Sequence, residues 1–223
     1  MPTAFDDLFP GNSFYRSVVR TDKDFRAGRL YTTHVYQPHR NLGFWRSSEV
    51  ASNTTAKNFN PVNADHVNDA FDHDPLHAPK LEATEEFIYL KAKKRPVVLI
   101  VPPMLEPDLE RSAYGAPMTR NLCLVAPINS MEKKGDAKHI PEFEMNVRSL
   151  RYPELMFLPE QGGVLKTDSV VRLDECQSVF VKNLTAIDFE LAQDVWQVLR
   201  SQFMYLFDQL DDDYFVQYRE MLS

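Results

Sequence analysis

The sequence predicts a mainly β protein: a small barrel or strongly curved sheet followed by a C-terminal helix. The first observation is a series of short apolar runs, rich in β-branched and aromatic residues and bounded by Gly, Pro and charged residues, which is typical of short strands. These runs span 28–36, 87–90, 96–101, 122–127, 170–173 and 178–181. The second observation is a hydrophobic spacing of three and four residues from Trp196 onward, which indicates an amphipathic helix.

The N-terminal part is predicted to be an arm followed by a strand. Residues 1–24 mix aromatic, proline and charged side chains without sustained periodicity, so we expect an arm that packs on a larger domain over 25–223. In the run 28–36, alternate residues project to opposite faces, and β-branched and aromatic side chains favour the extended backbone. Pro38 ends this strand.

A polar segment over 41–79 is rich in Asn, Ser, Thr, Asp and His and is predicted to be a long insertion or loop with a short helix over 64–71. His73 and His77 are four residues apart, which suits a metal pair on one helix face, but Pro75 disfavours a continuous helix. A polar loop without a metal is therefore favoured over a metal site. The cluster in question comprises His66, Asp69, Asp72, His73, Asp74 and His77.

The C-terminal helix is predicted over about 186–210. Thr185 followed by Asp188 resembles an N-cap with an acid near the positive end of the helix. A final short helix is predicted over 214–222. The apolar stripe that would pack on the barrel consists of Trp196, Leu199, Phe203, Leu206 and Leu210.

Composition restricts the class of protein. The formal net charge of −7 argues against a protein that coats nucleic acid, but it permits an enzyme with a small positive cleft. No apolar run approaches the ~18 residues of a membrane span, and the N-terminus lacks a basic region followed by an apolar core. We therefore expect a cytoplasmic protein with no membrane association. Cys123 and Cys176 are expected to be reduced thiols.

The chain contains, in order, the segment KRPVVLI at 94–100, the segment LVAPINS at 124–130, and a third segment over 162–179 that a terminal helix follows. Together these segments resemble the PemK/MazF family of toxin ribonucleases. The first is similar to the family's Arg-Pro-Val strand, the second to its apolar-Ala-Pro-Ile-Thr-Ser strand, and the third to the stretch that carries Ser-Val-Val, Asp-Gln and Arg-Thr-Val. The resemblance implies an SH3-like barrel over 25–223, a homodimer, cleavage of single-stranded RNA without metal or cofactor, and neutralisation by a cognate antitoxin protein.

Cleavage of RNA without a metal needs a base for the ribose 2′-hydroxyl, an acid for the leaving oxygen, and positive charge at the phosphate. Arg172 and Asp174 are two apart on a predicted strand, so their side chains project from the same face. The PemK branch has an Arg-x-Asp here, which implies Asp174 as base and Arg172 as acid or electrostatic clamp. Because arginine is a poor acid, the electrostatic role is favoured. The alternative is a surface ion pair that only stabilises the strand.

Arg95 stands where the MazF branch places its phosphate-binding catalytic arginine, directly before Pro96. It ends the basic run 91–95, in which Lys93 and Lys94 are candidates for contacts with the RNA backbone.

Asn129 and Ser130 complete the candidate RNA-binding set. Asn129 replaces the threonine usual in the family, and an amide does not reproduce the donor and acceptor geometry of a hydroxyl. This departure leaves a second function open: an inactive barrel that acts as a protein-binding or regulatory module. A toxin of the same fold that acts on a topoisomerase is less favoured, because it would not need positive RNA-binding groups.

Overall fold

The computed structural model describes residues 4–9, 14–19, 25–36, 43–47, 59–63, 85, 87–103, 121–133, 136–137, 140–208 and 213–222. The chain forms two compact units: Met1–Val35 together with Lys94–Ser223, and Tyr36–Lys93.

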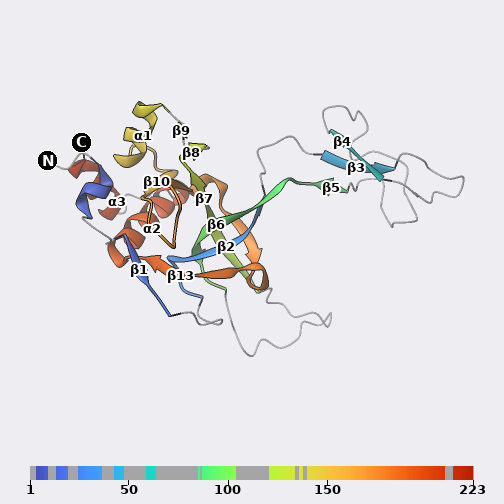
Figure 1. The fold of residues 1–223 in the computed structure, drawn as a ribbon, viewed down its shortest axis with the longest axis horizontal. Coiled ribbons are helices and arrows are strands. Elements are labelled where there is room, and N and C mark those ends of the chain that lie inside the picture. Colours follow the sequence, from blue (N-terminus) through green and yellow to red (C-terminus); the bar gives the residue numbers. More distant parts are fainter. Residues whose placement is uncertain are drawn as a thin grey trace, which may run out of the picture. The chain divides into compact units, whose positions relative to one another are not determined.

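The larger unit is built on an eight-stranded antiparallel sheet in the order β1-β13-β2-β6-β7-β11-β10, with β12 also paired to β7 (Figure 1). After β7, strands β8 and β9 form a short separate hairpin. The strands of the larger unit are β1 Tyr15–Ser17, β2 Arg29–Tyr36, β6 Ala92–Val101, β7 Leu122–Ser130, β8 Glu132–Lys133, β9 Asp136–Ala137, β10 Leu155–Leu158, β11 Ser169–Arg172, β12 Gln177–Phe180 and β13 Thr185–Leu191. The prediction of a mainly β protein with C-terminal helices is confirmed.

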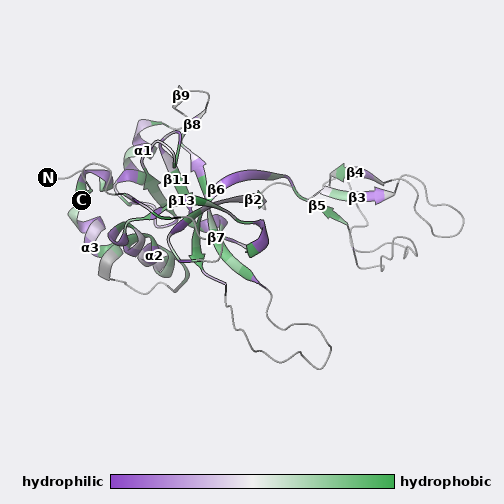
Figure 2. Ribbon diagram, turned by 60° about the horizontal axis from the view of Figure 1, so that its bottom comes forward, coloured by the Kyte–Doolittle hydropathy of each residue, from purple (hydrophilic) through white to green (hydrophobic). Residues whose placement is uncertain are grey.

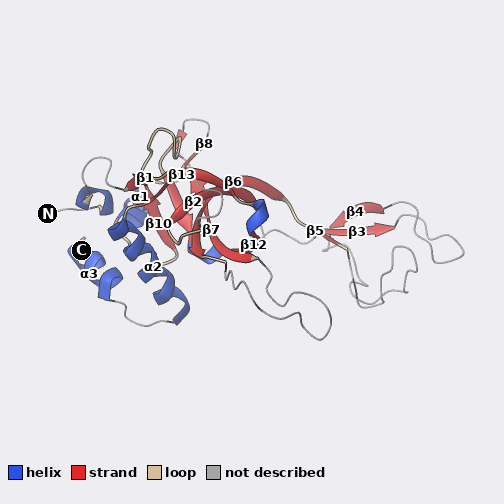
Figure 3. Cartoon of the chain, turned by 90° about the horizontal axis from the view of Figure 1, so that it is seen from below, coloured by secondary structure: helices blue, strands red, loops and turns tan. Residues whose placement is uncertain are grey.

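Figure 3 shows the helices beside the sheet, with α2 next to α3. The α-helices are α1 Pro141–Arg148, α2 Gln193–Asp208 and α3 Asp213–Met221, and the 3-10 turns are η1 Phe5–Leu8, η3 Leu173–Glu175 and η4 Val181–Asn183. Proline at the first position of α1 and Arg148 in its last turn suit the two ends of a helix.

The predicted start of the C-terminal helix is wrong, because 185–191 is strand β13 and α2 begins at Gln193. Ile187, Phe189 and Leu191 alternate toward the main core, while Asp188 is exposed. Strand β13 pairs with both β1 and β2. Hydrogen bonding to strands on both sides and the alternation of apolar side chains favour a strand here, and they outweigh the local N-cap pattern that predicted a helix.

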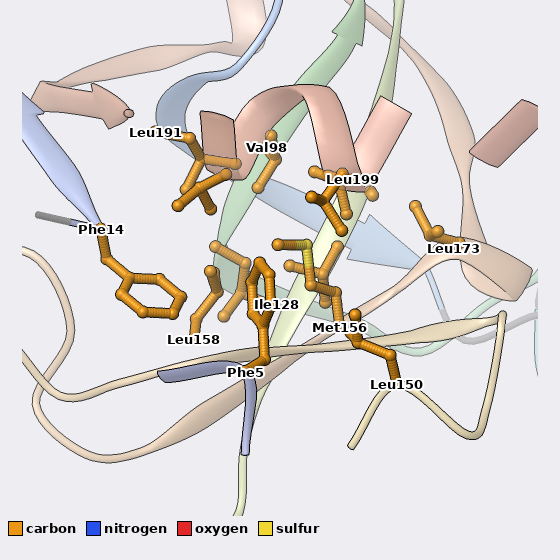
Figure 4. Packing of buried hydrophobic residues seen from close by; sticks show 14 of the residues in the cluster. Phe5, Phe14, Val98, Ile128, Leu150, Met156, Leu158, Leu173, Leu191 and Leu199 are labelled. Atoms are coloured by element: carbon orange, nitrogen blue, oxygen red, sulfur yellow. The ribbon is translucent and has the colours of Figure 1, made fainter. Parts of the chain in front are cut away.

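The main core lies on one face of the sheet, beneath α2. Val98, Ile128 and Met156 from three strands point toward Leu199 from α2 (Figure 4). The N-terminal arm adds to this cluster, since Phe5, Phe14 and Tyr15 are buried in it. The arm is therefore part of the core of the larger unit.

The smaller unit contains a three-stranded sheet in the order β4-β3-β5, formed by Phe59–Asn63, Gly43–Ser47 and Ile88–Tyr89. The segment predicted as a polar insertion thus contains two strands. Gly43 lies opposite Tyr89, and a Cβ atom at Gly43 would lie 2.1 Å from the Tyr89 ring, so the ring covers the glycine. The predicted helix over 64–71 and the cluster of His66, Asp69, Asp72, His73, Asp74 and His77 lie outside the described residues.

Candidate active site

The three segments that resemble the toxin family are neighbours in the sheet. They contain β6, β7 and β11, which are consecutive strands, and β12, which also pairs with β7. The registers place Val97 opposite Pro127 and Val170 opposite Asn129. Residues that are far apart in the sequence are therefore brought onto one contiguous surface.

Three candidate polar residues project from the same face of this surface. Val125 of β7 packs in one apolar cluster, and Met131, directly after β7, packs in another. Asn129 lies between these two residues in the sequence, at an even spacing from each. Arg95 precedes Val97 by two residues, and Arg172 follows Val170 by two residues. Because side chains alternate along strands, Arg95, Asn129 and Arg172 share the face that carries these two clusters.

Arg172 pairs with Asp174, as predicted, but the local structure that brings the two side chains together differs from the prediction. Strand β11 ends at Arg172, and Asp174 lies in turn η3. The prediction that both residues belong to one strand is wrong, since Leu173–Glu175 turns to bury Leu173 in the core. The turn still brings the groups together: Arg172 Nε donates to Asp174 Oδ1 at 2.8 Å, and Arg172 Nη2 donates to Oδ2 at 2.5 Å.

The surroundings of Arg172 fix its charge. The hydrogen bond to Asp174 raises the pKa of Arg172, and the charges of Glu175 and Glu154 add to this, while burial opposes it. Glu175 lies 3.3 Å from Arg172 Nη2. A guanidinium held this firmly in its protonated form cannot serve as a general acid near neutral pH, so it can act on a phosphate only as a clamp. Glu175 was not predicted as a site residue from the sequence, although it directly follows Asp174.

Arg95 and Asn129 supply further polar groups on this face. Arg95 is half-buried and has no ion pair with any residue that the structure describes. The Oδ1 atom of Asn129 is buried and has no hydrogen-bond partner within the described ranges. A buried acceptor left without a donor is costly. A ligand that supplies an O–H or N–H group would satisfy it.

Ser130 does not join this group. It pairs with Ser169, so its side chain projects from the face opposite to that of Asn129. Its hydroxyl lies 2.8 Å from Thr167 Oγ1 and donates to the Glu132 carbonyl oxygen at 2.9 Å. Ser130 therefore stabilises the turn after β7.

Lys93 and Lys94 are exposed in the first half of β6, which is hydrophilic (Figure 2). Lys94 belongs to the larger unit, as do Arg95, Asn129 and Arg172, whereas Lys93 belongs to the smaller unit.

No three side chains among the described His, Cys, Asp and Glu residues gather in a way that could hold a metal ion. None of the helices in the described part of the chain is both long enough and apolar enough to cross a bilayer.

Both cysteines are expected to react slowly in the folded protein. Burial raises the pKa of Cys123 to about 11, and burial together with the charge of Asp174 raises the pKa of Cys176 to about 12. These higher pKa values lower the thiolate fraction near neutral pH by about 100-fold for Cys123 and by about 1,000-fold for Cys176. Labelling with a disulfide reagent at pH 7.5 should be slow in buffer, fast in guanidinium, and faster in buffer as the pH rises. Equal rates in buffer and in guanidinium would contradict this.

Comparison with known proteins does not assign a family, since no family model and no curated protein matches the sequence. The toxin hypothesis therefore depends on the three segments and on the surface that they form.

Proposed function

We propose that this chain is an endoribonuclease of the PemK/MazF type that cleaves single-stranded RNA without a metal ion. The observation that carries the proposal is the adjacency of β6, β7 and β11, the strands on which the three family-like segments lie. Their shared face presents Arg95, Asn129 and the Arg172–Asp174 pair. An SH3-like barrel, a homodimer, a cytoplasmic location and an antitoxin partner are parts of the same proposal.

The roles of the side chains follow from their chemistry. Asp174 takes the proton of the ribose 2′-hydroxyl, because it is exposed and each carboxylate oxygen keeps a second lone pair beside the bond to Arg172. The 2′-oxygen then attacks the phosphorus, the bond from phosphorus to the 5′-oxygen breaks, and the leaving 5′-oxygen takes a proton from solvent water, because Arg172 cannot supply one. Arg172 stabilises the charge that develops on the phosphate, and Arg95 contacts the phosphate from the neighbouring part of the face. Asn129 accepts a hydrogen bond from the ribose or the base. Lys94 attracts the RNA backbone.

A second candidate function is an inactive module that binds a protein. The bidentate bond between Arg172 and Asp174 favours it, because it satisfies both groups without a substrate. Ser130, which the resemblance assigns to RNA, is engaged with Thr167.

The test is incubation of the full chain with a long single-stranded RNA in EDTA. We expect cleavage products with 2′,3′-cyclic phosphate ends, because the 2′-oxygen is the nucleophile. An Arg172→Ala, Asp174→Ala double variant is the control for a contaminating nuclease, and it should leave the RNA intact. Equal cleavage by both proteins, or cleavage that EDTA abolishes, would reject the proposal. If neither protein cleaves RNA, the binding module becomes the better function.

A further inference from the structure

The smaller unit carries two exposed aromatic rings on one face of its three-stranded sheet. Tyr89 of β5 lies opposite Gly43 of β3, so these two residues project from the same face. Trp45 follows Gly43 by two residues in β3 and therefore shares that face. The rings of Trp45 and Tyr89 are in contact, with centroids 6.2 Å apart and planes at 82°, an edge-to-face arrangement that aromatic pairs prefer.

The two faces of the central strand β3 differ in exposure. Trp45 is 45% exposed and Tyr89 beside it is 40% exposed, whereas Phe44, which projects from the other face, is 2% exposed. Pro61 of β4 lies opposite Trp45 and is exposed as well. Exposed Trp and Tyr side chains are enriched at binding surfaces, because they combine apolar area with a polar group.

The backbone beneath Tyr89 fixes the position of its ring. A Cβ atom at Gly43 would lie 2.1 Å from this ring, so the ring rests directly on the backbone at Gly43, where a larger residue would displace it. A ring that is held in place before a ligand arrives loses little freedom on binding, which lowers the entropic cost of the complex.

Positive charge follows these rings along the chain. Lys91 and Lys93 lie two and four residues after Tyr89, and all three belong to the smaller unit. A chain spans at most about 3.6 Å per residue, so the two lysine Cα atoms lie within about 7 and 14 Å of the Tyr89 Cα atom. Both lysines are exposed, and neither forms an ion pair with any residue that the structure describes.

We propose that this face binds single-stranded RNA, with bases stacked on Trp45 and Tyr89 and with phosphates beside Lys91 and Lys93. Stacking on aromatic side chains needs bases whose faces are open, which a single strand offers and a duplex does not. A neutral sugar or an apolar peptide would use the rings alone. The lysines favour a ligand that carries negative charge as well as flat rings.

The inference rests on the proposed function in one respect: that proposal makes RNA, and not single-stranded DNA, the natural ligand. Binding itself does not depend on cleavage. The surface is also separate from the candidate active site, whose arginines, Asn129 and Asp174 belong to the larger unit. One unit that holds the RNA while the other cleaves it raises the effective concentration of the substrate.

The test is a titration of the full chain with a short labelled single-stranded RNA, followed by fluorescence anisotropy. Every 2′-hydroxyl of this RNA is methylated, which removes the nucleophile and allows binding to be measured without cleavage. Trp45→Ala and Tyr89→Ala should each weaken the affinity about tenfold, a usual loss for one stacked base. Trp45→Phe keeps an aromatic ring and should weaken it less than about threefold.

Ile88→Ala is the matched control. Ile88 lies in the same strand as Tyr89 and is 45% exposed, but it projects from the opposite face. This variant should change the affinity less than about twofold, because it removes apolar surface of similar exposure without removing a stacking ring.

Two further measurements locate the RNA on this face. The Lys91→Ala, Lys93→Ala double variant should reduce the slope of log affinity against log salt by about 1.4, since each phosphate contact on a single strand contributes about 0.7. Stacking should also quench tryptophan fluorescence in the wild type. The quenching should be lost in Trp45→Phe, which keeps only Trp196 of the chain's two tryptophans.

Three results would overturn the proposal: no binding of RNA, a loss in Ile88→Ala equal to that in Tyr89→Ala, or duplex RNA that binds as tightly as the single strand. Wild-type affinity in both Trp45→Ala and Tyr89→Ala would also overturn it and would leave the face to a protein partner. The substituted side chains are exposed, and thermal unfolding of each variant checks that the fold is retained.

Cleavage of unmodified RNA in EDTA reports separately on the proposed function. Fluorescence quenching by RNA that the protein does not cleave would support this inference and count against the ribonuclease. Cleavage by the wild type with an unchanged KM in Trp45→Ala would do the reverse.

Discussion

Replacing Asp174 with asparagine is expected to lower the rate of RNA cleavage by about 10²- to 10⁴-fold, the usual contribution of a general base. Asparagine has the same shape and can still accept a hydrogen bond from Arg172, but it cannot take a proton. Asp174 is exposed, so the fold should tolerate the change. The measurement is the single-turnover cleavage rate of a labelled RNA, with unfolding of the variant followed in parallel.

Glu175→Gln is the matched control, because Glu175 is a neighbouring carboxylate that also contacts Arg172, at 3.3 Å. If Asp174 is the base, Glu175→Gln should keep most of the activity. Equal losses in both variants would indicate that the acids only orient Arg172. Cleavage at the wild-type rate in Asp174→Asn would identify the Arg172–Asp174 pair as a structural ion pair.

The strands could be predicted from the sequence wherever apolar and β-branched residues are concentrated. Strands β2, β6, β7, β11 and β12 correspond to predicted runs. Strand β10 was missed although all four of its residues are buried, because a short run of Leu, Met and Phe carries no β-branched residue. Strand β13 was taken for the start of a helix, since Thr185 and Asp188 suit an N-cap, and only the tertiary pairing with β1 and β2 decides otherwise.

The candidate site could be predicted from the sequence only where its residues are close together in the chain. Arg172 and Asp174 are neighbours in the sequence, so their contact follows from local geometry. That Asn129 projects from the same face as Arg172 depends on the register between β7 and β11, which no local pattern specifies. In the same way, no local pattern predicts that Arg16, Glu190 and Arg29 lie side by side, because they meet only when strands β1, β13 and β2 pair.

Replacing Arg148 with methionine is expected to destabilise the larger unit by about 2–3 kcal/mol, which corresponds to a fall in Tm of roughly 5–10 °C. Arg148 Nη1 lies 2.6 Å from Asp6, and its Nη2 lies 2.7 Å from Asp168 and 3.3 Å from Glu144. Its guanidinium carbon also lies 3.9 Å from the centre of the Phe157 ring. One cation thus joins the N-terminal turn, α1 and the segment before β11. Its loss leaves the carboxylates of Asp6, Glu144 and Asp168 close together without this shared positive partner.

The pH dependence of this variant provides a sharper test. Burial raises the pKa of Asp6 in the folded protein, and the charge of Arg148 opposes that rise. A carboxyl whose pKa is higher when folded disfavours the fold once it ionises, so its penalty is relieved as the pH falls through that raised pKa. Without Arg148 the penalty is larger. The stability difference between variant and wild type should therefore be greatest at neutral pH and smaller in mild acid, as measured by urea unfolding at both.

Arg151→Met, at an exposed position three residues away, should cost less than about 0.5 kcal/mol. A difference that does not change with pH would show that Arg148 acts through packing on Phe157 and not through its charge.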